Sequence, residues 1–180
     1  AALTRGTLPI NGVEVIKRNK SQQDYFTIAS LLKPYGYKSS FIYGGEARFD
    51  NMKSWYLGNG FDEVIEQKDY INPIFSSTWG VSDEDLVIKA NEKFKSYYEN
   101  KENFVSVMFS SSNHMPFELP EGKIEFEKNI PKASVENAIK YADFAIGKFF
   151  ELAKKEAYFK NTVFAVISDH NVRVYGDQIV

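Results

Sequence analysis

The spacing of apolar residues along the chain changes back and forth between a helical and a strand-like period. In several segments apolar side chains recur every three or four residues, which places them on one face of an amphipathic helix. The predicted helices are 24–33, 49–57, 82–98 and 134–153. Proline or glycine follows the first two segments directly, as expected where a helix ends.

Serine residues mark the starts of the two longest predicted helices. Ser82 precedes Asp83, Glu84 and Asp85, and Ser134 precedes the longest apolar stripe. A serine hydroxyl at this position accepts a hydrogen bond from a backbone N–H group that has no partner within the helix. Because acidic side chains favour the positive end of the helix dipole, we interpret the three acids as part of a helix start.

Short runs of apolar and β-prone residues predict the strands. These runs are 37–43, 61–65, 104–109 and 162–167. They alternate in sequence with the helices, and the clearest of them are apolar on both faces, which is typical of a buried parallel sheet. We therefore predict an α/β fold with a mostly parallel central sheet and helices on both faces.

Polar residues suited to metal binding or catalysis follow the ends of two predicted strands. Asp169 and His170 follow the last strand after Ser168. The only other histidine, His114, follows an earlier strand across three serines and Asn113. In parallel sheets ligands bind beyond the carboxyl ends of the strands. The sequence therefore predicts a site along this edge of the sheet, together with the loop after Tyr43.

Composition and charge narrow the functional classes. The 180 residues, 43% of them hydrophobic, suffice to bury a core, so we expect one ordered domain. The net charge is −2 and both signs are interleaved, which argues against a nucleic-acid binder. The absence of cysteine excludes disulfides and thiolate metal sites but leaves the compartment open. No apolar run approaches the roughly 20 residues that cross a bilayer.

The two ends of the chain carry little pattern of their own. We interpret residues 1–20 as an irregular segment and residues 21–180 as part of an α/β domain. The chain lacks an initiator Met, and its first residues do not have the layout of a signal peptide. It ends on the apolar pair Ile179-Val180. We interpret both ends as cuts within a longer protein, so that a targeting or membrane segment would lie outside the chain.

Several motifs, in the same order along the chain, resemble one known family. NTVFAVISDHNVRVYG is similar to the metal-binding strand and loop of sulfatase-like proteins in the alkaline phosphatase superfamily. SSSNHMPFELP is similar to the segment that places a histidine in the substrate pocket of lipoteichoic acid synthase-type proteins. YGYKSSFIYGG, NGFDEVI and TWGVSDEDL resemble further landmarks of this phosphoglycerol transferase group. The resemblance extends from the region of Tyr25 to the end of the chain.

The resemblance implies a truncated sulfatase-like α/β fold and the transfer or hydrolysis of a phosphoryl or sulfuryl ester. Enzymes of this kind use a divalent cation, usually manganese, magnesium or zinc, and a Thr or Ser nucleophile. By resemblance, Asp169 and His170 are metal ligands. His114 contacts the substrate with Asn113 beside it, and Arg173 offers its guanidinium to phosphate or sulfate oxygens.

The resemblance also implies a substrate class and a location. The substrate would be a phosphate or sulfate ester, such as a glycerophospholipid headgroup or a glycan ester of the cell envelope. The acceptor, water or an alcohol, stays open. The complete protein would be anchored in the membrane by helices that precede this chain, with its catalytic domain on the periplasmic side.

The chain departs from the family pattern in three places, one of which is Asn171 after His170, where many sulfatases have glycine. In the family, the nucleophile and a further acidic metal ligand precede the matched region, and no segment of this chain has their pattern. Synthases that act on phosphatidylglycerol carry a Trp and an Arg where this chain reads Ala-Arg-Phe-Asp-Asn at 47–51. We therefore expect the chain alone to bind metal weakly and to lack turnover, because two ligands leave a cation mostly to water.

Local pattern alone leaves simpler interpretations open. Asp169 also fits a turn or helix-capping residue, His114 fits a loop histidine bonded to the backbone, and Arg173 fits a solvated charge. At the level of function, the same residues fit a phosphoethanolamine transferase or a phosphomonoesterase of the same superfamily. They also fit a non-catalytic binding or sensing module that keeps the fold without the chemistry.

Overall fold

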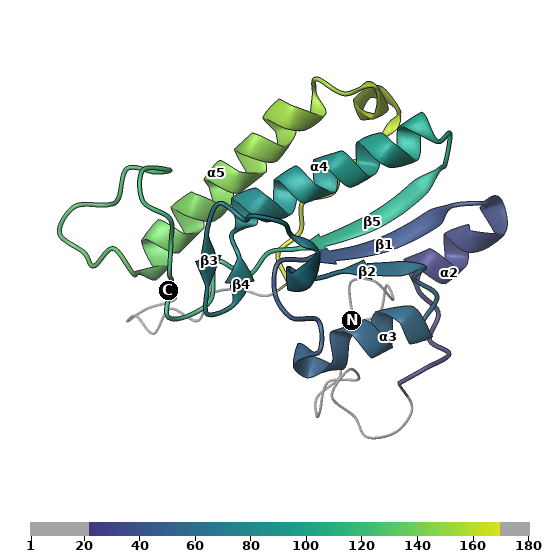
Figure 1. Ribbon diagram of the computed structural model, residues 1–180, viewed down its shortest axis with the longest axis horizontal. Helices are drawn as coiled ribbons and strands as arrows, with labels where there is room; N and C mark the ends of the chain where they lie inside the picture. Colours follow the sequence, from purple (N-terminus) through teal and green to yellow (C-terminus); the bar gives the residue numbers. More distant parts are fainter. Residues whose placement is uncertain (1–21, 170–180) are drawn as a thin grey trace, which may run out of the picture.

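The computed structural model describes residues 22–169 as an α/β domain built around a parallel sheet (Figure 1). In sheet order, the three strands are β2 (Glu63–Ile65), β1 (Lys38–Tyr43) and β5 (Phe104–Phe109). All pairings are parallel, and Phe41 of the central strand lies between Val64 and Val107. The predicted α/β class and parallel sheet are thus confirmed.

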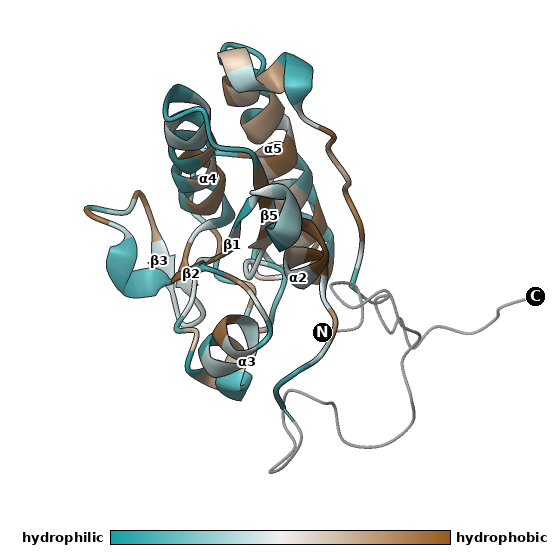
Figure 2. Ribbon diagram, turned by 90° about the vertical axis from the view of Figure 1, so that its right-hand side faces the viewer, coloured by the Kyte–Doolittle hydropathy of each residue, from teal (hydrophilic) through white to brown (hydrophobic). Residues whose placement is uncertain are grey.

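Helices cover both faces of this sheet (Figures 1 and 2). The long helices α4 and α5 pack on one face, and the short helices α2 and α3 pack on the other. The helices are α2 (Ile28–Leu32), α3 (Met52–Gly58), α4 (Asp83–Glu99) and α5 (Val135–Ala153). The smaller elements are the 3-10 helices η2 (Lys33–Tyr35), η3 (Phe49–Asn51), η4 (Gln67–Asp69) and η5 (Ala157–Asn161), and the antiparallel strands β3 (Ser76–Ser77) and β4 (Gly80–Val81).

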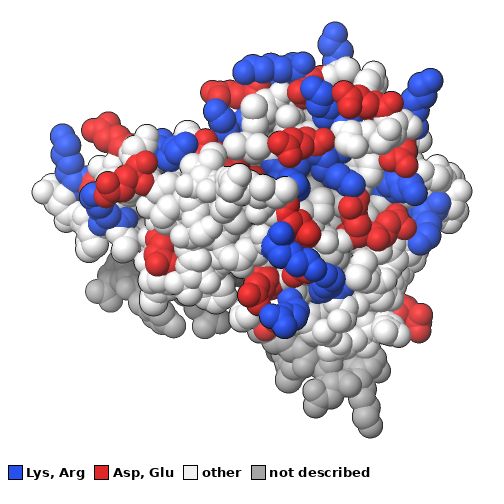
Figure 3. Space-filling view, in the orientation of Figure 1, with Lys and Arg blue, Asp and Glu red and all other residues white. Residues whose placement is uncertain are grey.

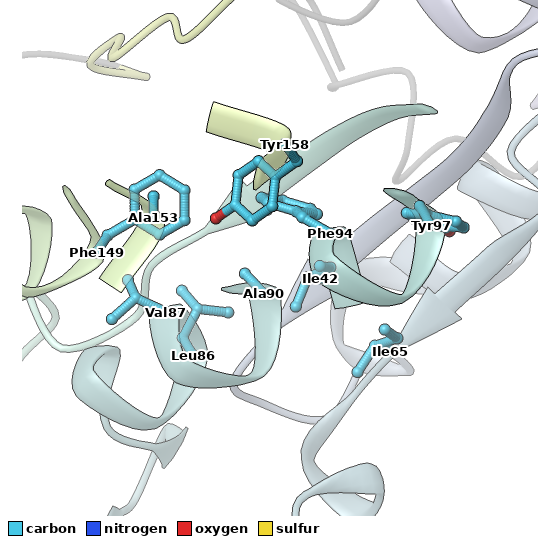
Figure 4. Packing of buried hydrophobic residues seen from close by; sticks show 10 residues of the cluster. All are labelled: Ile42, Ile65, Leu86, Val87, Ala90, Phe94, Tyr97, Phe149, Ala153 and Tyr158. Atoms are coloured by element: carbon cyan, nitrogen blue, oxygen red, sulfur yellow. The ribbon is translucent and has the colours of Figure 1, made fainter. Parts of the chain in front are cut away.

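The side chains of β1 alternate between two apolar cores. Ile42 belongs to the core under α4 and α5, where Phe94 and Phe149 meet edge to face (Figure 4). Phe41 belongs to the opposite core, where its ring stacks on Tyr56. Because Phe41 and Ile42 are both fully buried, β1 is covered on both of its faces.

The predicted serine caps are present at both long helices. The Ser82 hydroxyl accepts a hydrogen bond from the backbone N–H of Asp85, and the Ser134 hydroxyl accepts one from Asn137. The first predicted helix begins later than expected, because Thr27 caps α2 in a capping box with Ser30. It ends as predicted, since Gly36 takes a left-handed conformation after η2.

The predicted strand at 162–167 is wrong for the described structure. The segment leaves η5 at Thr162, whose hydroxyl donates to the Tyr158 carbonyl, and continues without pairing to any described strand. Val163 is 95% exposed, and in Figure 2 the segment is a brown trace outside the helical layers. Only Phe164 packs on the core, against Phe149 and its neighbours. An apolar, β-prone run forms a strand only where a partner edge supplies hydrogen bonds.

The described surface matches the mixed composition. Positive and negative side chains lie interspersed over the face shown in Figure 3 rather than in separate patches. Many belong to exposed ion pairs, such as Lys132 with Glu121 at 2.6 Å and Lys140 with Glu127 at 2.7 Å. Within residues 22–169, no helix combines the length and the apolar character that a membrane span requires.

Candidate functional site

The carboxyl ends of β1 and β5 meet at one edge of the sheet, because the two strands are parallel and in register. Gly44 follows β1, and its carbonyl oxygen accepts a hydrogen bond from the backbone N–H of Val81 at 2.9 Å. This bond holds the β3–β4 hairpin against the edge of the sheet. Gly80 in the hairpin has a φ of +117°, and a Cβ placed on it would lie 2.2 Å from the Gly44 carbonyl oxygen. Glycine is therefore required where the hairpin meets the sheet.

The first turn of α4 lies at the same edge and holds the loop after β5. The carboxylate of Asp83 accepts hydrogen bonds from the backbone N–H groups of Ser111 at 2.9 Å and Ser112 at 3.2 Å. In return, the Asp83 N–H donates to the Ser112 hydroxyl at 3.2 Å. All three residues are buried. These contacts fix the backbone that leads from β5 to His114.

The two acids that follow Asp83 hold two other loops. Asp85 accepts hydrogen bonds from the backbone N–H of Ile74 at 2.7 Å and of Phe75 at 3.3 Å, in the segment before β3. Glu84 forms a 2.6 Å ion pair with Lys123, which belongs to the long loop after His114. Both carboxylates are buried. The three consecutive acids therefore anchor three separate segments, a role that the helix dipole does not explain.

Burial dominates the electrostatics around Asp83. It raises the pKa of the Asp83 carboxyl above its ordinary value, and the bonds from Ser111 and Ser112 oppose this effect. The second oxygen, Oδ2, is buried without a hydrogen-bond partner among the described residues. Burial likewise raises the pKa of the nearby Tyr141 hydroxyl to about 12. A buried carboxylate with one oxygen unpaired costs stability.

His114 sits on an aromatic support at the same edge. Its Nδ1 lies 3.3 Å from the Ser111 carbonyl oxygen, and its ring centroid lies 5.0 Å from that of Trp79. Trp79 Nε1 donates to the Met115 carbonyl at 2.7 Å, and the Phe49 ring meets the indole edge to face at 5.4 Å. His114 itself is exposed, as is the neighbouring part of its loop. The imidazole is therefore supported on one side and open to solvent on another.

The loop after β1 is held by a buried carboxylate of its own. Glu66 accepts a hydrogen bond from the Ala47 N–H at 3.1 Å and pairs with Lys53 at 2.5 Å. Burial would raise the pKa of Glu66, but its bonds to Lys53 and Ala47 and the nearby Lys68 hold it below the ordinary value. The loop on the Phe49 side of the candidate site is thus also anchored by a buried carboxylate.

The structure describes only part of the predicted metal couple. Asp169 is exposed at the end of the extended segment, and His170 and Arg173 lie outside the described residues. Within residues 22–169, no group of three or more His, Asp or Glu side chains is placed to hold a metal ion. One carboxylate suits a hard divalent cation but does not by itself form a metal site.

The structure does bring His114 to the predicted edge of the sheet, with Asn113 exposed beside it. Sequence reasoning missed Trp79 and the three acids of α4 as parts of this region. A signal was present, because helix capping uses only one or two polar groups, whereas SDED supplies four in succession.

Comparison with known proteins assigns the family. A family model described as Sulfatase matches residues 1–179. The chain belongs to the Sulfatase family. A solved structure described as a protein in the alkaline phosphatase superfamily, from Vibrio parahaemolyticus, is 51% identical in sequence with a TM-score of 0.91. That match covers 99% of this chain and 44% of the other.

Relatives with named activities are more distant. The lipoteichoic acid synthase LtaP from Listeria monocytogenes is 27% identical with a TM-score of 0.67, and covers 74% of this chain and 34% of its own. Phosphoglycerol transferase I of Xanthomonas campestris is 26% identical over 79% of this chain and 21% of its own length. Lipoteichoic acid synthase 2 of Bacillus subtilis is 24% identical over 84% and 24%. This Sulfatase-family chain thus spans under a quarter of these curated relatives.

Proposed function

We propose that this chain is part of a metal-dependent phosphoryl or sulfuryl transferase or hydrolase of the phosphoglycerol transferase type. The observation that carries the proposal is the placement of His114, which lies exposed on an aromatic support at the carboxyl edge of the parallel sheet. Ligands bind at this edge in α/β folds. Membership of the Sulfatase family and relatives named phosphoglycerol transferase and lipoteichoic acid synthase support the same reaction class.

The proposed roles follow the predicted residues. Asp169 and His170 would hold a divalent cation, manganese, magnesium or zinc, together with groups outside this chain. When bound, the cation would polarise the nucleophile and screen charge on the transferred group. His114 and Asn113 would contact the substrate, and Arg173 would offer its guanidinium fork to phosphate or sulfate oxygens. The nucleophile would also come from outside the chain, so that the chain alone would be inactive.

The proposed substrate is a phosphate or sulfate ester of the cell envelope, either a glycerophospholipid headgroup or a glycan ester. The names of the curated relatives favour the phosphoglycerol ester among these. The proposed location is the periplasmic side of the membrane, with the complete protein anchored by helices outside this chain.

Assays on the complete protein test this function. Turnover would be compared on glycerophospholipid, phosphomonoester and sulfate ester substrates, with manganese present. We expect activity on at least one ester, and His114→Ala should lower kcat/KM about 10- to 100-fold, the cost of one hydrogen bond to a charged group. Lys140→Ala, in an exposed ion pair on α5, is the matched control. Absence of turnover on all three ester classes would leave a non-catalytic module as the better account.

A further inference from the structure

A continuous set of hydrogen bonds joins the start of α4 to the imidazole of His114. Asp83 accepts from the Ser111 N–H at 2.9 Å, and the carbonyl of the same Ser111 lies 3.3 Å from His114 Nδ1. Ser111 is 2% exposed, so its peptide groups have little access to water. The orientation of the Ser111 backbone therefore determines where its carbonyl oxygen lies relative to the imidazole of His114.

We infer that Asp83 is a positioning residue that fixes the tautomer and orientation of His114 through the Ser111 backbone. A carbonyl oxygen only accepts hydrogen bonds, so its partner His114 Nδ1 must carry the proton. In the neutral imidazole the other nitrogen, Nε2, is then unprotonated and presents a hydrogen-bond acceptor. The tautomer of His114 is a property of this chain and does not depend on the proposed function. Only the contact of Nε2 with a substrate rests on the proposed function.

The local contacts favour this role over simple helix capping. Ser82 already caps α4 through its hydroxyl, so the helix does not need the Asp83 carboxylate for that purpose. Asp83 instead directs one oxygen to two consecutive amides of the loop. Two hydrogen bonds to the same carboxylate oxygen hold the loop backbone in one arrangement. Trp79 completes the support by packing against the imidazole ring.

Nitrogen-15 NMR of the imidazole rings tests the inference on the 180-residue chain without any assay of activity. The chain has two histidines, and His170→Gln identifies the signals of His114. At about pH 8, above the ordinary imidazole pKa of about 6.5, protonated and unprotonated ring nitrogens have separate shifts. We expect wild-type His114 to have mainly the Nδ1–H form. A majority of the Nε2–H form, which free imidazole side chains prefer, would overturn the inference.

Two substitutions separate positioning from general stability. Asp83→Ala should lower the Nδ1–H fraction of His114 at least about twofold, because the Ser111 backbone loses its anchor. Asp83→Asn keeps an oxygen acceptor, so it should fold and retain the wild-type tautomer. The control is Asp62→Ala, which removes an exposed carboxylate that accepts a hydrogen bond from the Ser39 N–H at 2.9 Å, at the opposite edge of the sheet. An unchanged His114 spectrum in folded Asp83→Ala, or equal shifts in the Asp62 control, would overturn the inference.

If Asp83→Ala does not fold, the His114 tautomer can still be measured in the wild-type chain and in Asp83→Asn. In the complete protein, Asp83→Ala should add little further loss of kcat/KM once His114 is already alanine, since both changes remove one effect. Fully additive losses would count against positioning through His114. If His114→Ala leaves turnover unchanged, the proposed contact of His114 with the substrate fails, while the NMR result for the tautomer remains valid.

Discussion

The indole of Trp79 and the imidazole of His114 pack against each other with ring centroids 5.0 Å apart and planes inclined by 37°. Trp79 also donates from Nε1 to the carbonyl of Met115, the residue after His114. Two contacts therefore join a hairpin before α4 to the loop after β5. This relationship gives the candidate site a rigid wall formed by segments that are distant in sequence.

Replacing Trp79 tests the role of that wall. Trp79→Phe keeps an aromatic face but removes the hydrogen bond to Met115, so we expect a loss of about 1 kcal/mol in the free energy of unfolding of the chain. Trp79→Ala should cost more and should also weaken substrate binding by the complete protein, seen as a raised KM. Trp55→Phe, in the buried core of α3, should lower stability without changing KM in the folded enzyme. Equal effects of Trp79→Ala and Trp55→Phe on KM would contradict a specific role for Trp79.

Gly80 should not tolerate a side chain. Alanine there combines a φ of +117° with a Cβ 2.2 Å from the Gly44 carbonyl oxygen, so Gly80→Ala should lower the free energy of unfolding by about 2 to 4 kcal/mol. Gly122→Ala is the matched control, because its φ is +75° and nothing lies within 4 Å. It should cost only about 1 to 2 kcal/mol. Urea denaturation of the three chains measures the difference, and equal losses would show that the close approach is unimportant.

Glu66 should make stability depend on acid pH. Its pKa lies below the ordinary 4.5 in the folded chain, so the folded state binds the proton more weakly than the unfolded state. Its contribution is therefore complete well above pH 4.5 and is lost as the pH falls through that value and then through the folded pKa. Glu66→Gln should be less stable than wild type near neutral pH, and the difference should shrink on acidification. A difference that grows as the pH falls would contradict this sign.

The chain alone should bind manganese weakly. Asp169 and His170 would provide at most two protein ligands, and affinity depends on the number of ligands and on their support. Isothermal titration of the chain with Mn²⁺ should give no submicromolar site, and Asp169→Asn should abolish any weak binding. A submicromolar site in wild-type chain would show that the chain holds more of the metal cage than we propose.

Local chemistry predicted most of the fold. Ser82 and Ser134 mark helix starts because the caps depend on neighbouring backbone N–H groups, and Gly36 marks a helix end for a similar local reason. The central strand was predictable because residues 37–43 follow a strand-like alternation that ends at Gly44 and Gly45. Information for each of these elements lies within a few residues, where sequence patterns are most direct.

Features that depend on distant partners were not predictable in the same way. The segment 162–167 has the composition of a strand, but pairing depends on an edge that no local pattern specifies. The acids after Ser82 looked like dipole partners, whereas Asp83 bonds to a loop 28 residues away. The position of His114 at the sheet edge was predictable from the parallel topology, but its packing on Trp79 was not.

The most direct test of the account is replacement of His170 by alanine in the complete protein. We expect His170→Ala to lose bound divalent metal and turnover on the ester substrate while its circular dichroism and melting behaviour stay close to wild type. Metal content and turnover measured on the same preparation decide the matter. Turnover at the wild-type rate with metal still bound would contradict the proposal that Asp169 and His170 hold the catalytic cation.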